Sequence, residues 1–187
     1  MGLVPVFDEI LDAARVGAHW AWTRLYDEYS PLLFAYARSR GAPDAEDLVG
    51  EVFLQVVRDL GSFQGGESDF RRWIFTVTRN RMIDSLRHRR RRPFDATDPA
   101  ELASHGPTGN AEDEALEGIV TEELQELLLS LTPDQREVLL LRVFGDLSID
   151  QIAIVVGKRP GAVKALQHRA LATLRKILQS GVTISDS

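Results

Sequence analysis

Arginine side chains are concentrated in one stretch of the chain, residues 70–92, which reads FRRWIFTVTRNRMIDSLRHRRRR. Asp84 is the single acid within it. Guanidinium groups bind phosphates through paired hydrogen bonds and stack on flat faces, and aromatic rings stack on exposed bases. Arginines beside Trp and Phe therefore predict binding of a polyanion with flat faces, such as single-stranded nucleic acid. The stretch alone leaves open a second interpretation, an ordinary core helix with a solvated charged end.

Apolar spacing predicts that this stretch is a helix packed on two sides, with its arginines exposed. One stripe follows the i, i+3, i+4, i+7 pattern and consists of Phe70, Trp73, Ile74 and Val77. A second stripe consists of Phe75, Met82 and Leu86. Because Trp73 lies on the first stripe, burial in the core is as good an interpretation of it as contact with nucleic acid.

Charge is distributed unevenly along the chain. The formal net charge is -6, yet residues 93–150 are strongly acidic and residues 151–185 contain lysines and arginines without an acid. Two basic blocks are therefore separated by an acidic one, which the acidic net charge hides.

Several classes of function are disfavoured by what the sequence lacks. There are no cysteines, which excludes disulfides, thiolate zinc sites and thiol redox sensing by this chain. His19, His88, His105 and His168 are scattered without metal-ligand spacing, so no cofactor or metal is expected. The acidic N-terminus does not resemble a signal peptide and no apolar run has membrane-spanning length. We therefore expect a cytoplasmic protein with no membrane insertion.

Helix signals recur along the whole chain, and the fold class is predicted to be all-α. In the first half we expect helices over residues 6–16 and 18–40, and a third from an Asp44 cap to about residue 60. The third helix carries an acidic face, for which solvation is the simplest interpretation. A glycine-containing loop, 61–69, then leads into the basic helix, with Ser68 or Asp69 as its cap.

Residues 93–115 lack apolar periodicity and are rich in Pro, Gly and acids, which predicts a flexible linker between two helical units. The second unit is expected to open with a helix over 116–131. Thr132, Pro133 and Gln135 then form a capping box with proline at the first helical position. That helix is expected to run to Phe144 and to stop at Gly145.

The end of the chain has the pattern of a helix-turn-helix. A second capping box, Ser148 to Gln151, starts a short helix, Gly157 makes a turn, and Pro160 starts a last helix that reaches about residue 178. Rotation by about 100° per residue places on its exposed side Lys164, Ala165, His168, Arg169, Ala172, Arg175 and Lys176. This acid-free face suits a helix that reads the major groove. The alternative is a helical bundle with a basic surface.

Three blocks in series are similar to bacterial sigma factors of the sigma-70 family, extracytoplasmic-function (ECF) type: DAEDLVGEVFLQVVRDLGSF, FRRWIFTVTRNRMIDSLRHRRRRP and LTPDQREVLLLRVFGDLSIDQIAIVVGKRPGAVKALQHRALATLRK. The resemblance implies a region 2-like domain over 1–93, an acidic linker over 94–115 and a region 4-like helix-turn-helix domain over 116–187. It also implies a function: binding core RNA polymerase and directing promoter-specific initiation, with DNA melting.

The resemblance assigns roles to residues of this chain. Contact with the −10 element falls to Phe63, Trp73, Arg79, Asn80, Arg87, Arg89, Arg90 and Arg91. Contact with the −35 element falls to Arg159, Lys164, Ala165, His168, Arg169, Arg175 and Lys176. Core polymerase is expected to bind Asp44, Glu46, Asp47, Leu48, Glu51 and Gln55. The implied partners are the β′ clamp helices and β flap of core RNA polymerase, promoter DNA, and an anti-sigma factor.

Two other classes of function were weighed against this one. A stand-alone helix-turn-helix regulator would account for the last helix but would leave residues 70–92 unexplained. An enzyme acting on nucleic acid is disfavoured, because the sequence offers no phosphate-binding glycine loop, metal cluster or nucleophile–base pair.

Overall fold

The computed structural model describes residues 6–91 and 121–182, and every regular element in these ranges is helical. The prediction of an all-α fold is confirmed. The elements are α1 (Phe7–Arg15), α2 (His19–Ser39), α3 (Ala45–Asp59), the 3₁₀ turn η1 (Leu60–Ser62), α4 (Glu67–Arg91), α6 (Glu122–Leu129), α7 (Pro133–Val143), α8 (Ile149–Val156) and α9 (Pro160–Val182). The predicted linker, 94–115, lies outside the described residues.

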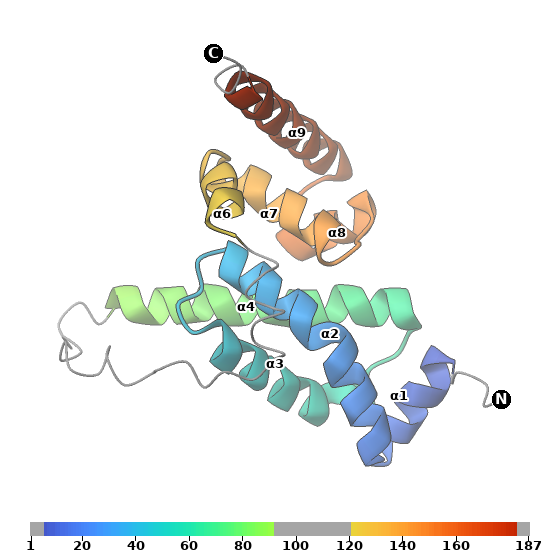
Figure 1. Cartoon of the computed structure of the whole chain (residues 1–187). Coiled ribbons are helices and arrows are strands. Elements are labelled where there is room, and N and C mark those ends of the chain that lie inside the picture. Colours follow the sequence, from blue (N-terminus) through green and yellow to red (C-terminus); the bar gives the residue numbers. More distant parts are fainter. Residues whose placement is uncertain (1–5, 92–120, 183–187) are drawn as a thin grey trace, which may run out of the picture.

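Helices α1 to α4 form an N-terminal bundle around α4 (Figure 1). Phe70, Ile74 and Phe75 of α4 are completely buried. Phe70 packs edge-on against Tyr29 of α2, with ring centroids 5.2 Å apart. The two apolar stripes expected from the sequence therefore hold α4 between its neighbours, and its position fixes the loop that precedes it.

Two local expectations for this bundle need correction. Helix α4 begins at Glu67, so Ser68 and Asp69 lie inside its first turn and neither is the cap. Asp44 does occupy the N-cap position of α3, but its side chain makes no capping hydrogen bond there. Helix α2 continues through Pro31 as a single element.

Helices α6 to α9 form a C-terminal bundle in which the starts of α7 and α8 follow the predicted caps. The helix predicted over 116–131 is observed as α6, which begins at Glu122 with Thr121 as its cap, and residues 116–120 lie outside the described residues. The Thr132 hydroxyl oxygen accepts a hydrogen bond from the Gln135 N–H, and Gln135 Oε1 accepts one from the Thr132 N–H. Ser148 and Gln151 form the equivalent box at α8. These boxes fix where α7 and α8 begin, and hence how they present α9.

The turn after α7 differs in detail from the prediction. The positive φ, 45°, falls on Asp146 and not on Gly145. Glycine is required at position 145 for a different reason: a Cβ there would lie 2.6 Å from the carbonyl oxygen of Leu141. The turn therefore depends on close backbone approach.

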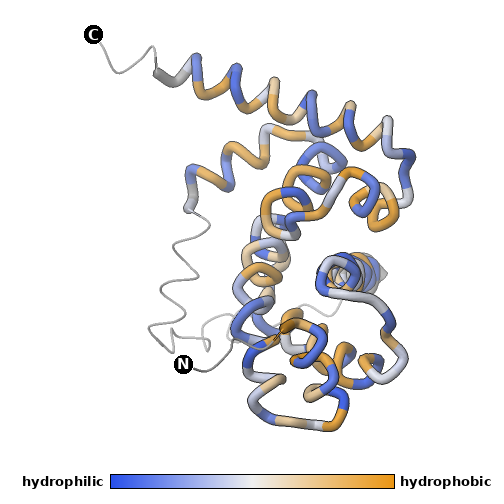
Figure 2. The backbone as a smooth tube through the Cα atoms, turned by 90° about the vertical axis from the view of Figure 1, so that its right-hand side faces the viewer, coloured by the Kyte–Doolittle hydropathy of each residue, from blue (hydrophilic) through white to orange (hydrophobic). Residues whose placement is uncertain are grey.

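The two bundles contact each other through α2 with α7 and through α4 with α8. Figure 1 shows them as two tiers, with α9 extending away from the lower tier. Apolar and polar residues alternate along α9 at the spacing of one helical turn (Figure 2). The amphipathic last helix thus lies on its own bundle and leaves one face uncovered.

Candidate nucleic-acid interface

The first arginines of α4 are not the exposed cations that the sequence predicted. Arg71 lies 3.6 Å from Glu28 and 3.1 Å from Glu67, and Arg72 lies 3.2 Å from Asp69. These guanidinium groups are partly buried and already have carboxylate partners. The expectation of exposure is therefore wrong for them, because acids from α2 and from the start of α4 fold onto the basic helix.

Phe63 and Trp73 form a stacked aromatic pair at the start of α4. Their ring centroids are 5.0 Å apart with an interplanar angle of 22°, and both side chains are half-buried against the core. Together with Arg72 and Gln64 they line a surface hollow. Half-exposed rings beside a guanidinium offer the faces on which an unstacked base can be received.

Arg15 of α1 supports this aromatic pair, and sequence analysis did not identify it. Its Nη2 donates a 2.8 Å hydrogen bond to the carbonyl oxygen of Phe63, while its Nη1 pairs with Asp12 at 2.7 Å. The contact joins residues far apart in the chain, so no local sequence pattern could have shown it. Arg15 therefore fixes the backbone from which the Phe63 ring projects.

Trp73, Asn80 and Arg87 recur at intervals of seven residues, which places them along one face of α4. Asn80 and Arg87 are exposed, and Arg87 lies 3.4 Å from Asp84. This face continues from the aromatic pair toward the end of α4. The side chains of Arg89, Arg90 and Arg91 lie outside the described residues.

The exposed face of α9 agrees with the sequence prediction. The residues assigned to duplex recognition are all exposed: Lys164, Ala165, His168, Arg169, Arg175, Lys176 and, just before the helix, Arg159. Val163 and Ala170 on the opposite side are completely buried. A rigid helix with a basic face and a small residue, Ala165, at its centre can approach a DNA groove closely.

The turn that positions α9 is held by specific contacts. Gly157 adopts a left-handed conformation with a φ of 67° and ends α8. Next to it, Lys158 Nζ lies 2.9 Å from Asp134 of α7. The turn at Gly157 and the ion pair of Lys158 together fix the start of α9. The orientation of its basic face therefore follows from the fold of the C-terminal bundle.

The exposed face of α3 is partly apolar, which sequence analysis missed. Leu54 and Val57 are 64% and 52% exposed. Leu48, which was assigned to polymerase contact, is only 7% exposed and packs in the core, so that assignment is corrected. Asp47 and Glu51 are exposed on the same helix. Apolar side chains flanked by acids form a surface typical of protein contact.

Arg81 of α4 also reaches this α3 face. Its Nε donates a 2.9 Å hydrogen bond to Gln55 Oε1, and its Nη1 lies 3.2 Å from Glu51. Two of the side chains assigned to polymerase contact are therefore held in place by the basic helix. Asp44 and Glu46, the remaining members of that set, are exposed at the start of α3.

Arg79, assigned to the −10 element, faces the C-terminal bundle instead of solvent. Its Nε lies 3.3 Å from Glu137 Oε1 of α7. Arg40 Nη2 lies 2.6 Å from Glu137 Oε2, and the Tyr36 hydroxyl donates a 2.5 Å hydrogen bond to Oε1. Burial, followed by the negative charge of Glu137, raises the pKa of Tyr36 well above its ordinary value. Three groups of one bundle thus converge on one carboxylate of the other.

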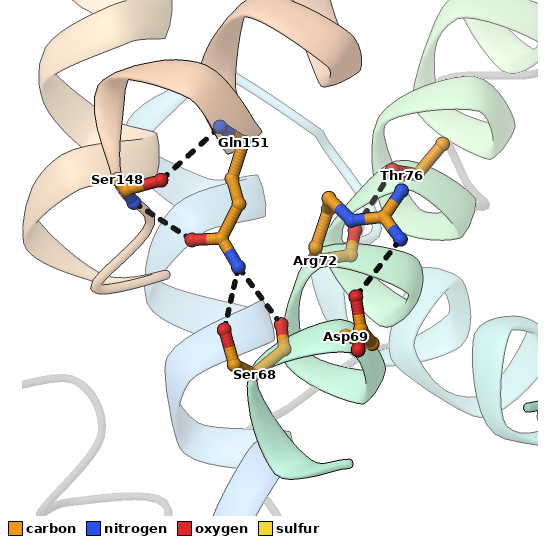
Figure 3. A network of polar contacts seen from close by, with 6 residues as sticks. All are labelled: Ser68, Asp69, Arg72, Thr76, Ser148 and Gln151. Carbon is orange, nitrogen blue, oxygen red and sulfur yellow. Dashed lines mark hydrogen bonds and ion pairs between the residues drawn. The ribbon is translucent and has the colours of Figure 1, made fainter. Parts of the chain in front are cut away.

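A second polar contact joins the bundles at the start of α4 (Figure 3). Gln151 Oε1 accepts from the Ser148 N–H at 2.8 Å within the capping box. Its Nε2 donates to the Oγ and the carbonyl oxygen of Ser68, at 2.6 and 3.1 Å. One side chain therefore caps α8 and holds α8 against α4.

Residues 6–91 and 121–182 contain no group of His, Asp and Glu side chains arranged to hold a metal ion. Within the same ranges, no helix is both long enough and apolar enough to cross a membrane.

Comparisons with known proteins cover both bundles. Residues 25–92 match the family model of sigma-70 region 2, and residues 121–174 match that of sigma-70 region 4. The ECF RNA polymerase sigma factor BldN of Streptomyces coelicolor is 36% identical over 91% of this chain, which spans 65% of that protein. The RNA polymerase sigma factor CarQ of Myxococcus xanthus is 31% identical over 90% of this chain and 95% of its own length.

A solved structure has the same fold. The sigma factor RpoE of Bartonella quintana, crystallised with the anti-sigma factor NepR, superposes with a TM-score of 0.64 and 24% identity, over 84% of this chain and 96% of that one. Both family regions are matched in order, and a relative above 30% identity is covered almost completely. The chain belongs to the sigma-70 family of RNA polymerase sigma factors, in its extracytoplasmic-function group.

Proposed function

We propose that this chain binds core RNA polymerase and directs it to promoters by reading two DNA elements with two different surfaces. The observation that carries the proposal is the presence, in one chain, of a stacked, half-buried aromatic pair and an exposed helix face that is basic and free of acids. Phe63 and Trp73 supply the first, and the exposed face of α9 supplies the second. A stand-alone regulator needs only the helix, and the region 2 match covers the segment that it would leave unused.

In this proposal the aromatic pair receives an unstacked base of the −10 element. Unstacking costs a few kcal/mol, which stacking on an aromatic side chain offsets by about 1–3 kcal/mol per base. Asn80 offers an amide that hydrogen-bonds base edges, and Arg87 neutralises a phosphate further along α4. Arg15 acts indirectly, because it holds the backbone of Phe63.

The −35 element is read by α9 in the same proposal. Lys164, Ala165, His168 and Arg169 face the bases, and Arg159, Arg175 and Lys176 face the phosphates. Base contacts then give sequence preference, whereas phosphate contacts give affinity that falls steeply with salt.

The outer face of α3 is the proposed docking site for the β′ clamp helices. It combines the exposed Leu54 and Val57 with the acids Asp44, Glu46, Asp47 and Glu51. Buried apolar contact gives affinity, and charge complementarity at the rim gives orientation. The C-terminal bundle is expected to contact the β flap.

An anti-sigma factor is the proposed regulator, because the RpoE structure contains a sigma factor bound to one. Such a protein would act in the cytoplasm, where polymerase is found. We assign no catalytic residue and no cofactor to this chain, since a sigma factor changes where polymerase starts and performs no reaction itself.

Run-off transcription tests the proposal. Purified bacterial core polymerase is incubated with genomic promoter fragments, with and without this protein. We expect specific start sites that appear only when the protein is added, with shared sequences about 10 and 35 bases upstream. Binding to duplex DNA without any effect on core polymerase would instead support the stand-alone regulator.

A further inference from the structure

We propose that Tyr36, Arg40 and Arg79 form an anion site, here called the anion cradle, which Glu137 occupies when the bundles are packed and a DNA phosphate occupies when they separate. The inference rests on the proposed function and adds a binding site to it. It makes Glu137 a carboxylate mimic of the DNA backbone.

The geometry of the anion cradle is that of an oxyanion receptor. Glu137 Oε1 receives the Tyr36 hydroxyl at 2.5 Å and lies 3.3 Å from Arg79 Nε. Glu137 Oε2 lies 2.6 Å from Arg40 Nη2. One donor and two guanidinium groups therefore surround both carboxylate oxygens, and Glu137 is only 5% exposed. The same three groups can satisfy two oxygens of a phosphodiester.

Positive charge is in excess around this carboxylate. Two guanidinium groups, those of Arg40 and Arg79, share the single negative charge of Glu137. Arg40 also donates to the carbonyl oxygen of Pro133 at 3.5 Å. When Glu137 leaves, Arg40 and Arg79 remain together on the N-terminal bundle without the carboxylate that neutralised them. A polyanion is the ligand that this charge would attract.

The proposed function requires the bundles to separate. Elements centred on −10 and −35 are roughly 25 base pairs apart, or about 85 Å along B-form DNA. In the packed arrangement, α8 is hydrogen-bonded to α4 through Ser68 and Gln151 and also packs on α9. The aromatic pair and the exposed face of α9 are thus separated by only a few helices, each about 10 Å across. This separation is too short to span both elements.

The first test measures single-strand binding by the free full-length chain. Fluorescence anisotropy with labelled oligo(dT) of 15 nucleotides reports phosphate contact without depending on any promoter sequence. Glu137→Gln keeps the shape but presents an amide N–H₂ toward the guanidinium groups. We expect this variant to bind oligo(dT) about tenfold more tightly, since apparent affinity scales with the fraction of molecules whose bundles are separated. Its radius of gyration, measured by X-ray scattering, should also be larger.

Matched variants separate this mechanism from a simple change in net charge. Glu126→Gln removes the same charge from an exposed position on α6 of the same bundle, so it should change binding by less than about twofold. Adding Arg40→Gln to Glu137→Gln should reverse the gain in affinity. It should also make the slope of log K against log salt concentration shallower by about 0.7, the value of one single-strand phosphate contact. Tyr36→Phe, which removes one hydrogen bond without altering charge, should give an intermediate gain and serves if Glu137→Gln unfolds.

Two results would overturn the proposal. The first is a Glu137→Gln chain that expands while its affinity for oligo(dT) stays unchanged, which would make Glu137 an interdomain contact only. The second is an equal gain in Glu126→Gln, which would make the effect one of net charge. Run-off transcription with core polymerase is measured in parallel: a Glu137→Gln chain that still directs initiation separates failure of this inference from failure of the proposed function.

Discussion

Leu54 and Val57 are the side chains whose replacement tests the polymerase-docking face most directly. They are 64% and 52% exposed on α3, so the fold of the N-terminal bundle depends little on them. The double substitution Leu54→Ala and Val57→Ala places the best helix former at both positions.

The expected magnitude follows from the exposed fractions. Full burial of a Leu or Val side chain is worth about 1.5–3 kcal/mol, and more than half of each is still exposed. Docking that covers both would therefore add about 2 kcal/mol beyond what Ala supplies, which corresponds to about 30-fold in affinity for core polymerase. Less than about 1 kcal/mol of folding stability should be lost, since surface substitutions usually have small effects.

Affinity is measured by anisotropy of fluorescently labelled protein titrated with core polymerase, and stability by thermal unfolding. Val16→Ala is the control, because Val16 is 85% exposed on the same bundle but lies outside α3. It should bind core polymerase like the wild type. If the double variant also bound with unchanged affinity, the outer face of α3 would not be the docking site and Leu54 and Val57 would be ordinary exposed residues.

Three further predictions concern stability and DNA binding. Gly157→Ala should lower the free energy of unfolding by about 1 kcal/mol. A Cβ at this position would meet nothing within 4 Å, but the φ of 67° strains a residue that carries one. An unchanged melting temperature in thermal unfolding would contradict this. Burial raises the pKa of Tyr29 and of Tyr36, so the unfolded chain loses these two protons at a lower pH than the folded chain does. The free energy of unfolding should therefore be constant below about pH 10 and fall above it by about 1.4 kcal/mol per pH unit for each tyrosine. Denaturant unfolding across that range should show the fall, and the double Tyr→Phe variant should lack it. Arg175→Gln should lower the salt slope of duplex binding by about 0.9 and leave sequence preference unchanged; a change in preferred sequence would assign Arg175 to base contact.

Helix positions in the C-terminal bundle could be predicted because their signals are local. The capping boxes at Thr132 and Ser148 and the left-handed turn at Gly157 involve neighbours in sequence. The buried and exposed sides of α9 followed from its period alone. Leu171 follows the completely buried Ala170 on α9 yet is 44% exposed, which the period alone does not indicate.

The state of the arginines could not be predicted because their partners are distant in sequence. Arg71 meets Glu28 from α2, and Arg79 meets Glu137 from the other bundle. Similarly, α3 is apolar on most of its circumference, so only its neighbours in the fold determine that Leu48 is buried and Leu54 is not. Periodicity identifies such a helix but cannot assign its faces.

These ion pairs change what the arginine-rich helix contributes to DNA binding. A phosphate that approaches Arg71, Arg72 or Arg81 must compete with a carboxylate already in contact, so each such contact releases less free energy than one with a free cation. The segment's contribution to affinity is then smaller than its composition indicates. What remains distinctive of this region is the stacked, half-buried pair formed by Trp73 of α4 and Phe63 in the loop before it. In the proposed function, selective recognition of an unstacked base therefore contributes more than electrostatic attraction to the role of this helix.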